Sequence, residues 1–186
     1  MMNSLPFELV PSRVDHTEAF YELYLRNRSA WGPWLPHNPS LFTRHGQRER
    51  LRAEETARDQ GNGYAFGIWY GAQLVGRIAL TGVERGFFQN AHLGYAVDVA
   101  YQGRGLATQA TRRVVDFAFT VIRLHRVDAA VLMDNRASMR VLEKVGFRLI
   151  GTAPYYLAIG GEWRDHQLYA ITLEEANVGE SRSNPV

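Results

Sequence analysis

The first candidates for chemistry in this chain are backbone amides rather than side chains. The segment from Gln102 to Thr108 contains two glycines and leads directly into an amphipathic helical pattern. Glycine permits a positive φ and close approach by a ligand, and amides at a helix N-terminus attract anions. The pattern predicts an anion cradle of pyrophosphate size, bound by Gln102, Gly103, Arg104, Gly105, Leu106, Ala107 and Thr108.

Two familiar phosphate-binding loops do not match this segment. The Walker loop needs a Lys-Ser/Thr pair after its last glycine, where this chain has Leu106 and Ala107. The dinucleotide fingerprint needs a third glycine where Thr108 stands, and Asp128, although at the distance of the acidic residue, does not replace that glycine. The anion cradle is therefore expected to serve a different pyrophosphate-bearing ligand.

A second candidate is the helical segment that starts at Asn135. Asn135 is a good N-cap, and Ser138 shares a stripe with the apolar residues Val141, Leu142 and Val145, so its side chain should face inward. One interpretation is that the Ser138 hydroxyl only caps the first helical turn. The other is that it lies where the reactive end of a bound ligand emerges. The spacing alone leaves both interpretations open.

Composition limits the classes of protein to consider. At 186 residues and 46% hydrophobic content, the chain is expected to form a single domain over residues 1–173, followed by a polar, disordered tail over residues 174–186. A formal net charge of +2 gives no support for nucleic-acid binding. The absence of cysteine excludes disulfides, thiolate metal sites and an acyl-cysteine intermediate.

The chain shows no sign of targeting to a membrane. The N-terminus lacks a basic segment followed by an apolar one, and no apolar run approaches the length of a membrane span. We therefore expect a soluble, cytoplasmic protein without a membrane partner.

Periodicity predicts a mixed α/β (α+β) fold with alternating elements. A hairpin turn at residues 71–72 makes the two strands beside it antiparallel, so the first part of the sheet should be a meander. The expected helices are residues 17–28, 44–60, 107–121 and 135–145, and a break is expected over residues 31–36. The expected strands are residues 7–10, 64–70, 73–80, 88–97, 126–133, 147–159 and 163–173.

Two motifs carry a resemblance to a known family. Gln102-x-x-Gly105-x-Ala107 resembles the coenzyme A pyrophosphate loop of the GNAT acyltransferase superfamily, and Asn135-x-x-Ser138 followed by Glu-Lys-x-Gly-Phe147 resembles its second conserved segment. The resemblance implies a mostly antiparallel sheet of about seven strands, splayed near the cofactor and flanked by about four helices. It also implies acetyl-CoA as co-substrate, no metal, and contact between Asn135 and the pantetheine or adenosine of the cofactor.

The family fold further implies that the strand ending near residue 99 splays away from its neighbour. Amides around Val97 and Val99 should then bind the pantetheine and polarise the acetyl carbonyl. Ser138 or Tyr155 could hand a proton to the departing thiolate. Because the chain has no cysteine and no serine in a G-x-S-x-G elbow, direct transfer in a ternary complex is favoured over a covalent acyl-enzyme.

Further motifs are similar to one branch of the family, the RimJ/RimL ribosomal-protein N-terminal acetyltransferases. They are residues 31–36, residues 82–86 before Leu93-Gly-Tyr95, and residues 156–166. The branch implies a protein N-terminus, such as that of a ribosomal protein, as acceptor. It often has an acidic residue where this chain has Tyr155, so the general base is open. His92 is a rival base, although a half-buried structural histidine is the favoured interpretation.

The charge state of the nucleophile also favours an N-terminus. An α-amino group, with a pKa of about 7.7 to 8.0, is partly neutral near pH 7.4, whereas a lysine at about 10.4 is almost wholly charged. A weak base is enough for the first amine only. Two alternatives stay open: acetylation of a small amine such as an aminoglycoside, a polyamine or an amino acid analogue, and a coenzyme A-binding module without catalysis.

The remaining expectations concern surroundings of the site. An acceptor groove is expected from the aromatic residues Trp31, Trp34, Phe87, Phe88 and Tyr155. In the hairpin after residue 159, Trp163 is expected to cover the core while Arg164 pairs with Asp165. A monomer and a homodimer are both compatible with the sequence.

Overall fold

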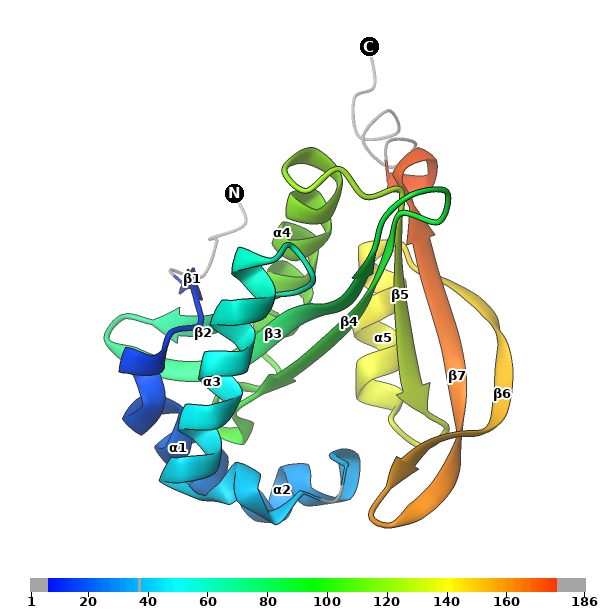
Figure 1. The fold of residues 1–186 in the computed structure, drawn as a ribbon. Coiled ribbons are helices and arrows are strands. Elements are labelled where there is room, and N and C mark those ends of the chain that lie inside the picture. The colour runs from blue at the N-terminus through cyan, green and yellow to red at the C-terminus, as the bar shows by residue number, and fades with distance from the viewer. Residues whose placement is uncertain (1–6, 37, 177–186) are drawn as a thin grey trace.

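A computed structural model describes residues 7–36 and 38–176 of the protein (Figure 1). Seven strands form one open sheet in the order β1-β2-β3-β4-β5-β7-β6. All neighbouring strands are antiparallel except β4 and β5, which are parallel. The strands are β1 (Phe7–Pro11), β2 (Tyr64–Tyr70), β3 (Gln73–Glu84), β4 (Asn90–Val97), β5 (Arg126–Leu132), β6 (Arg148–Ile159) and β7 (Glu162–Thr172).

The parallel pair at the centre of the sheet separates soon after it forms. Only three residue pairs join β4 to β5, from Asn90↔Arg126 to His92↔Asp128, although β4 continues to Val97 and β5 to Leu132. Figure 1 shows the two strands diverging toward the end of the sheet at which α2 and the β6–β7 turn lie. We call the space between the diverging strands the β4–β5 gap.

The helices cover the two faces of the sheet. They are α1 (Thr17–Arg26), α2 (Arg28–Trp31), α3 (Arg44–Asp59), α4 (Leu106–Thr120) and α5 (Arg136–Val145), with short 3-10 turns at 14–16, 32–34, 39–42 and 99–101. Side chains of α4 and α5, including Val114 and Leu142, share one core cluster with Leu93 and Val97 of β4. Side chains of α1 and α3 share a second cluster, against which Ala96 of β4 packs. Residues 93, 95 and 97 of β4 therefore face α4 and α5, whereas His92, Gly94 and Ala96 face the other side.

The expected fold class is confirmed, as a mixed α/β fold with a seven-stranded open sheet. The strand expectations hold within a few residues, and the expected helices are all present. The main difference is α2, a turn of helix over Arg28–Trp31 that overlaps the segment expected to break the chain. The turn forms because the Trp31 amide donates a hydrogen bond to the backbone carbonyl of Asn27.

The end of the chain is also folded further than expected. Residues 173–176 form a helical turn in which Glu175 pairs with Arg148, and Glu174 lies 3.0 Å from His125 Nε2. The rest of the expected tail, residues 177–186, lies outside the described residues. None of the helices in residues 7–36 and 38–176 is long and apolar enough to cross a membrane.

Candidate active site

The anion cradle, residues 102–108, connects the end of β4 to α4. Gly103 and Gly105 adopt φ of 73° and 78°, the left-handed region that favours glycine. Gly105 is the N-cap of α4 and provides no side-chain cap, so the first amides of the helix are left for a ligand. A Cβ placed on Gly103 would meet nothing within 4 Å, and one on Gly105 only Gln109 Nε2 at 3.8 Å. This open space beside uncapped amides fits the diphosphate of coenzyme A.

The side chains of the anion cradle divide into those that pack and those that face outward. Leu106 is 1% exposed and belongs to the core, so it can offer only its amide. Arg104 donates to the carbonyl of Ala100, and its guanidinium lies 4.9 Å from the centre of the Tyr101 ring. This contact keeps a positive charge next to the cradle.

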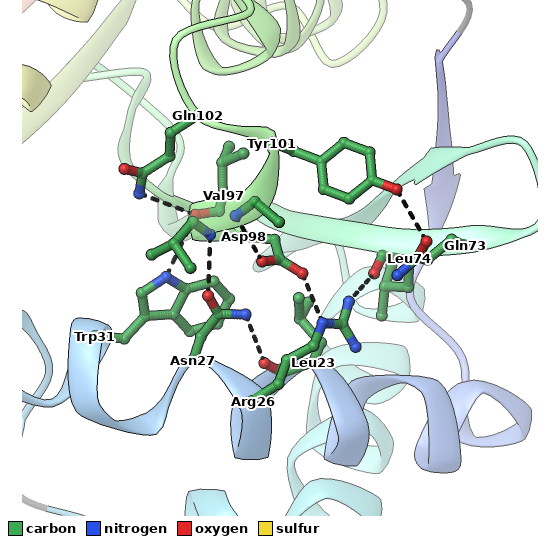
Figure 2. Close-up of polar contacts among 12 residues, drawn as sticks. Leu23, Arg26, Asn27, Trp31, Gln73, Leu74, Val97, Asp98, Tyr101 and Gln102 are labelled. Carbon is green, nitrogen blue, oxygen red and sulfur yellow. Dashed lines mark hydrogen bonds and ion pairs between the residues drawn. The ribbon is translucent and has the colours of Figure 1, made fainter.

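The end of β4 is fixed by one side chain from a distant helix and one from the loop that follows the strand (Figure 2). The carbonyl of Val97 accepts hydrogen bonds from Trp31 Nε1 at 3.3 Å and from Gln102 Nε2 at 3.2 Å. Gln102, expected to bind the cofactor, thus uses its amide group to hold the loop on the strand. Trp31 is 5% exposed, so it is a structural residue and not part of an open acceptor groove.

The amide of Val99, which was expected to bind the pantetheine, already has a hydrogen-bond partner in this structure. That amide donates to Oδ1 of the buried Asn27 at 3.0 Å, and Asn27 Nδ2 donates to the carbonyl of Leu23 (Figure 2). The next ion pair along this surface, Arg26 Nε to Asp98 Oδ2 at 2.6 Å, fastens the same turn to α1. A sequence pattern could not reveal that Val99 already has a partner.

The amide of Val97 has the opposite orientation. Asp98 donates its amide to the carbonyl of Val75 on β3. Amides of an antiparallel pair alternate along the strand, so the N–H of Val97 points away from β3 and into the β4–β5 gap. The expectation for Val97 is therefore compatible with the geometry, and this amide is suited to bind an extended ligand lying in the gap.

Ser138 is held at the gap by Tyr95, a residue that the sequence interpretation did not select. Tyr95 Oη lies 2.8 Å from Ser138 Oγ and 3.2 Å from the Ser138 carbonyl. Burial raises the pKa of the Tyr95 phenol to about 12, and the hydrogen bond to Ser138 offsets part of that rise. The phenol is therefore protonated at any pH near neutrality. Tyr95 shares the spacing of two residues with Leu93 and Val97, and this pattern in the sequence could have placed it on the face of β4 that meets α5.

The first turn of α5 is capped by the Asn135 side chain and not by the Ser138 hydroxyl. Asn135 Oδ1 accepts from the Ser138 amide at 3.1 Å and so provides the N-cap of α5. The Ser138 hydroxyl is thereby released from capping and pairs with Tyr95. Asn135 stands as predicted at the start of α5, where its Nδ2 group remains for a ligand; its contact with the cofactor stays a prediction.

The other expected site residues are not brought to Ser138. Tyr155 has a φ of 49° and a side chain exposed by 75%, and its amide donates to Asp165 Oδ1. No hydrogen bond among the described residues joins its phenol to Ser138 or Tyr95, so its role as proton donor stays a prediction. His92 lies on the opposite face of β4, at the apex of the gap, beside Asp128.

Two further expectations are corrected by the fold. Phe87 and Phe88 lie in the β3–β4 turn, next to the Glu84↔Asn90 pair and so at the end of β4 away from Val97. Figure 1 shows this turn at the opposite end of the sheet from α2 and the β6–β7 turn, so the aromatic residues expected to form one groove are divided between the two ends. In the β6–β7 hairpin Trp163 is 64% exposed and does not cover the core. Arg164 pairs with Asp134 at 3.8 Å, not with Asp165, because Asp165 holds the Tyr155 amide.

Together, the splayed parallel pair, the uncapped helix N-terminus at the end of β4 and the polar pair across the gap define a class. A diphosphate bound at the anion cradle would direct an extended arm along β4 toward Ser138 and Tyr95. This is the architecture of acyltransferases that use coenzyme A thioesters.

Comparison with known proteins agrees with this class. Residues 7–148 match the family model described as the acetyltransferase (GNAT) domain. The probable N-acetyltransferase YjcK of Bacillus subtilis is 42% identical over 132 residues, which cover 70% of this chain and 73% of YjcK. The [ribosomal protein uS5]-alanine N-acetyltransferase of Escherichia coli is 30% identical over 161 residues, 85% of this chain and 83% of that protein.

Solved structures give the same result. RimJ of Mycobacterium smegmatis in complex with CoA-disulfide superposes with a TM-score of 0.87 at 30% identity, covering 95% of this chain and 90% of that one. The chain belongs to the GNAT acetyltransferase family, and its relatives include the RimJ/RimL ribosomal-protein acetyltransferases. It is an N-acetyltransferase that uses acetyl-CoA.

Proposed function

We propose that the acceptor is the α-amine at the N-terminus of a protein, a ribosomal protein above all. The observation that carries this proposal is the similarity, over 85% of the chain, to an enzyme named for acetylating an alanine of ribosomal protein uS5. The similarity in sequence and fold to a RimJ structure supports it. Exposed aromatic side chains on the β6–β7 hairpin, Tyr155 and Trp163, give a surface suited to an extended peptide.

The binding of acetyl-CoA follows from the site. The amides of the anion cradle and the positive end of α4 hold the diphosphate. The Val97 amide binds the pantetheine in the β4–β5 gap, and Asn135 contributes from the start of α5. Thioester chemistry then takes place level with Tyr95, where the two strands are too far apart to pair.

Departure of the thiolate requires a proton at that level. Ser138 Oγ can donate its proton to the sulfur and take one from Tyr95 Oη, 2.8 Å away. A phenol with a pKa of about 12 does not ionise near neutrality, so Tyr95 acts as a reserve of this proton and orients the Ser138 hydroxyl. The Ser138–Tyr95 pair can therefore protonate the departing thiolate without a charged side chain in the gap.

The experiment is a thiol-release assay with acetyl-CoA over a panel of acceptors. Ala- and Ser-initiated peptides should be acetylated at their α-amines, as mass spectrometry would locate, and the same peptides blocked at the N-terminus should give no thiol. Preference for polyamines or aminoglycosides would replace the proposal by small-amine acetylation. Tight coenzyme A binding with no thiol released for any acceptor would indicate a binding module.

A further inference from the structure

The hairpin motif contains a buried histidine whose tautomer the structure fixes. His166 of β7 is 3% exposed, and its Nδ1 lies 2.9 Å from the carbonyl oxygen of Arg164. A carbonyl oxygen only accepts hydrogen bonds, so Nδ1 must carry a hydrogen, and in the neutral imidazole Nε2 then presents its lone pair. No described residue hydrogen-bonds Nε2, and this atom is not completely closed off from solvent.

The sheet register puts His166 at the height of the reacting centre. Leu132, the last residue of β5, pairs with His166. Continuing the register from His92↔Asp128 brings Ala96 of β4 level with Leu132, so His166 lies at about the height of Tyr95 along the gap. His92 is closer to the apex by four residues, or about 13 Å at roughly 3.3 Å per residue.

His166 also lies on the face of the sheet opposite Ser138. Tyr169 and Ile171 of β7 belong to the core under α4 and α5, so the alternating position 166 points to the other face. Tyr156 of β6 covers it there, with 5.7 Å between the ring centroids. Only β5 separates β7 from the β4–β5 gap, so an amine that attacks the thioester from this face would arrive on the side of the sheet on which His166 lies, while the sulfur departs toward Ser138.

We propose that His166 Nε2 is the base that deprotonates the attacking amine, an inference that rests on the proposed N-terminal acceptor. Nε2 removes one proton from the ammonium group and later passes it to solvent. The neutral nitrogen forms the C–N bond, the C–S bond breaks, and the nitrogen loses its second proton to water. The thiolate gains one proton from Ser138, which solvent restores through Tyr95.

Four ionisable groups of the described residues are placed near His166 by their contacts or by their position on the hairpin. They are Tyr156 across on β6, Arg164 and Asp165 on the same strand, and Asp134 after β5, which pairs with Arg164. Asp165 is occupied by the Tyr155 amide, which stabilises the irregular part of β6 beside His166. Members of the RimJ/RimL branch often have an acidic residue where this chain has Tyr155, and His166 would provide a base in its place.

The test uses the full-length enzyme and the variant His166→Asn. The asparagine Nδ2–H can replace Nδ1–H as donor to the Arg164 carbonyl but provides no basic nitrogen. With an Ala-initiated peptide near pH 7, we expect kcat/KM to fall about 100-fold. With an aminooxyacetyl peptide, whose amine is already neutral, it should fall by less than about threefold, because no proton has to be removed before attack.

Two controls separate a base from a structural role. His92→Gln, on the same face but at the apex of the gap, should keep kcat/KM within about threefold for both acceptors. The deficit of His166→Asn should shrink as the pH rises above about 8, where the peptide α-amine is neutral without help. Coenzyme A affinity, measured by calorimetry, should be unchanged.

The outcomes are distinguishable. An active wild-type enzyme with equal losses for both acceptors in His166→Asn, or with no loss for either, overturns the inference and leaves the proposed function intact. A wild-type enzyme that releases thiol with the aminooxyacetyl peptide but never with a peptide α-amine overturns the proposed N-terminal acceptor itself.

Discussion

The Tyr95 phenol oxygen lies 2.8 Å from Ser138 Oγ, across the gap left where β4 and β5 separate. The two residues come from a strand and a helix 43 positions apart, and both are only partly exposed. The contact turns two ordinary hydroxyl groups into a donor pair that faces the expected path of the thioester. It is the most specific feature of the site, since the anion cradle alone would bind any diphosphate of suitable shape.

Replacing Ser138 tests the proton donor. In Ser138→Ala, kcat for an Ala-initiated peptide should fall by about 10- to 100-fold, because the thiolate must leave without a proton. Coenzyme A affinity and the unfolding midpoint should change little, since the Asn135 side chain still caps α5. Steady-state kinetics, calorimetry and thermal unfolding measure the three quantities. A loss of stability parallel to the loss of rate would return Ser138 to a structural role.

Replacing Tyr95 should have a smaller effect on rate. Tyr95→Phe keeps the ring that packs against the core but removes the reserve proton, so we expect about a tenfold lower kcat with the Ser138 hydroxyl still present. The double variant should be no slower than Ser138→Ala, because both hydroxyls act in one path. Independent, multiplying losses would show that the two residues do not form a relay.

The raised pKa of the Tyr95 phenol implies that the free energy of unfolding depends on pH. The phenol has a folded-state pKa of about 12 against about 10 when unfolded, so the folded state binds this proton more tightly. Its contribution is therefore fully present below about pH 10 and lost as the pH rises toward 12, by about 2 to 3 kcal/mol. Urea unfolding of the wild type and Tyr95→Phe at about pH 9 and 11.5 would measure it. A difference between the two proteins that stays constant with pH would exclude the shift.

The anion cradle can be tested with matched glycine variants. Gly105→Glu puts a carboxylate and a strained φ of 78° inside the cradle, and should abolish coenzyme A binding. Gly86→Glu places the same side chain at a φ of 74° in the remote β3–β4 turn, where a Cβ meets nothing within 4 Å. Both should lose about 1 to 2 kcal/mol of stability, but only the first should lose affinity. Normal calorimetric binding by Gly105→Glu would remove the loop from the account.

Asn27 is predicted to support the site from beneath. In Asn27→Ala the partly buried Val99 amide loses its acceptor, at a cost of about 1 kcal/mol, and the turn that presents the anion cradle loosens. We expect a lower unfolding free energy together with a raised KM for acetyl-CoA. Asn27→Asp should not recover the KM, because it keeps the acceptor for Val99 but sets a second oxygen against the Leu23 carbonyl at a fully buried position. Denaturant titration and initial rates provide the measurements.

The sequence predicts well what depends on local backbone chemistry. The anion cradle follows from Gly103 and Gly105 because the required positive φ leaves a visible residue preference. The strands follow from alternation, and the Asn135 cap from its spacing to Ser138.

Contacts between distant segments could not be predicted in this way. The partners of Val99 and Asp98 lie 72 residues earlier, in α1 and just after it, and no periodicity links them. Tyr95 alternates along β4 with buried apolar residues, so the sequence pattern marks it as an ordinary core residue. Only the packing of α5 against β4 reveals that its hydroxyl contacts Ser138. The prediction of an aromatic groove was wrong for the same reason, since Phe87 and Trp31 have similar side chains but lie at opposite ends of β4.

The most direct measurement is a crystal structure of the protein with coenzyme A. We expect the diphosphate within hydrogen-bonding distance of the amides of residues 103–108, the pantetheine on the Val97 amide, and the sulfur next to Ser138 Oγ. A diphosphate bound elsewhere, or a sulfur directed away from Ser138 and Tyr95, would contradict this expectation.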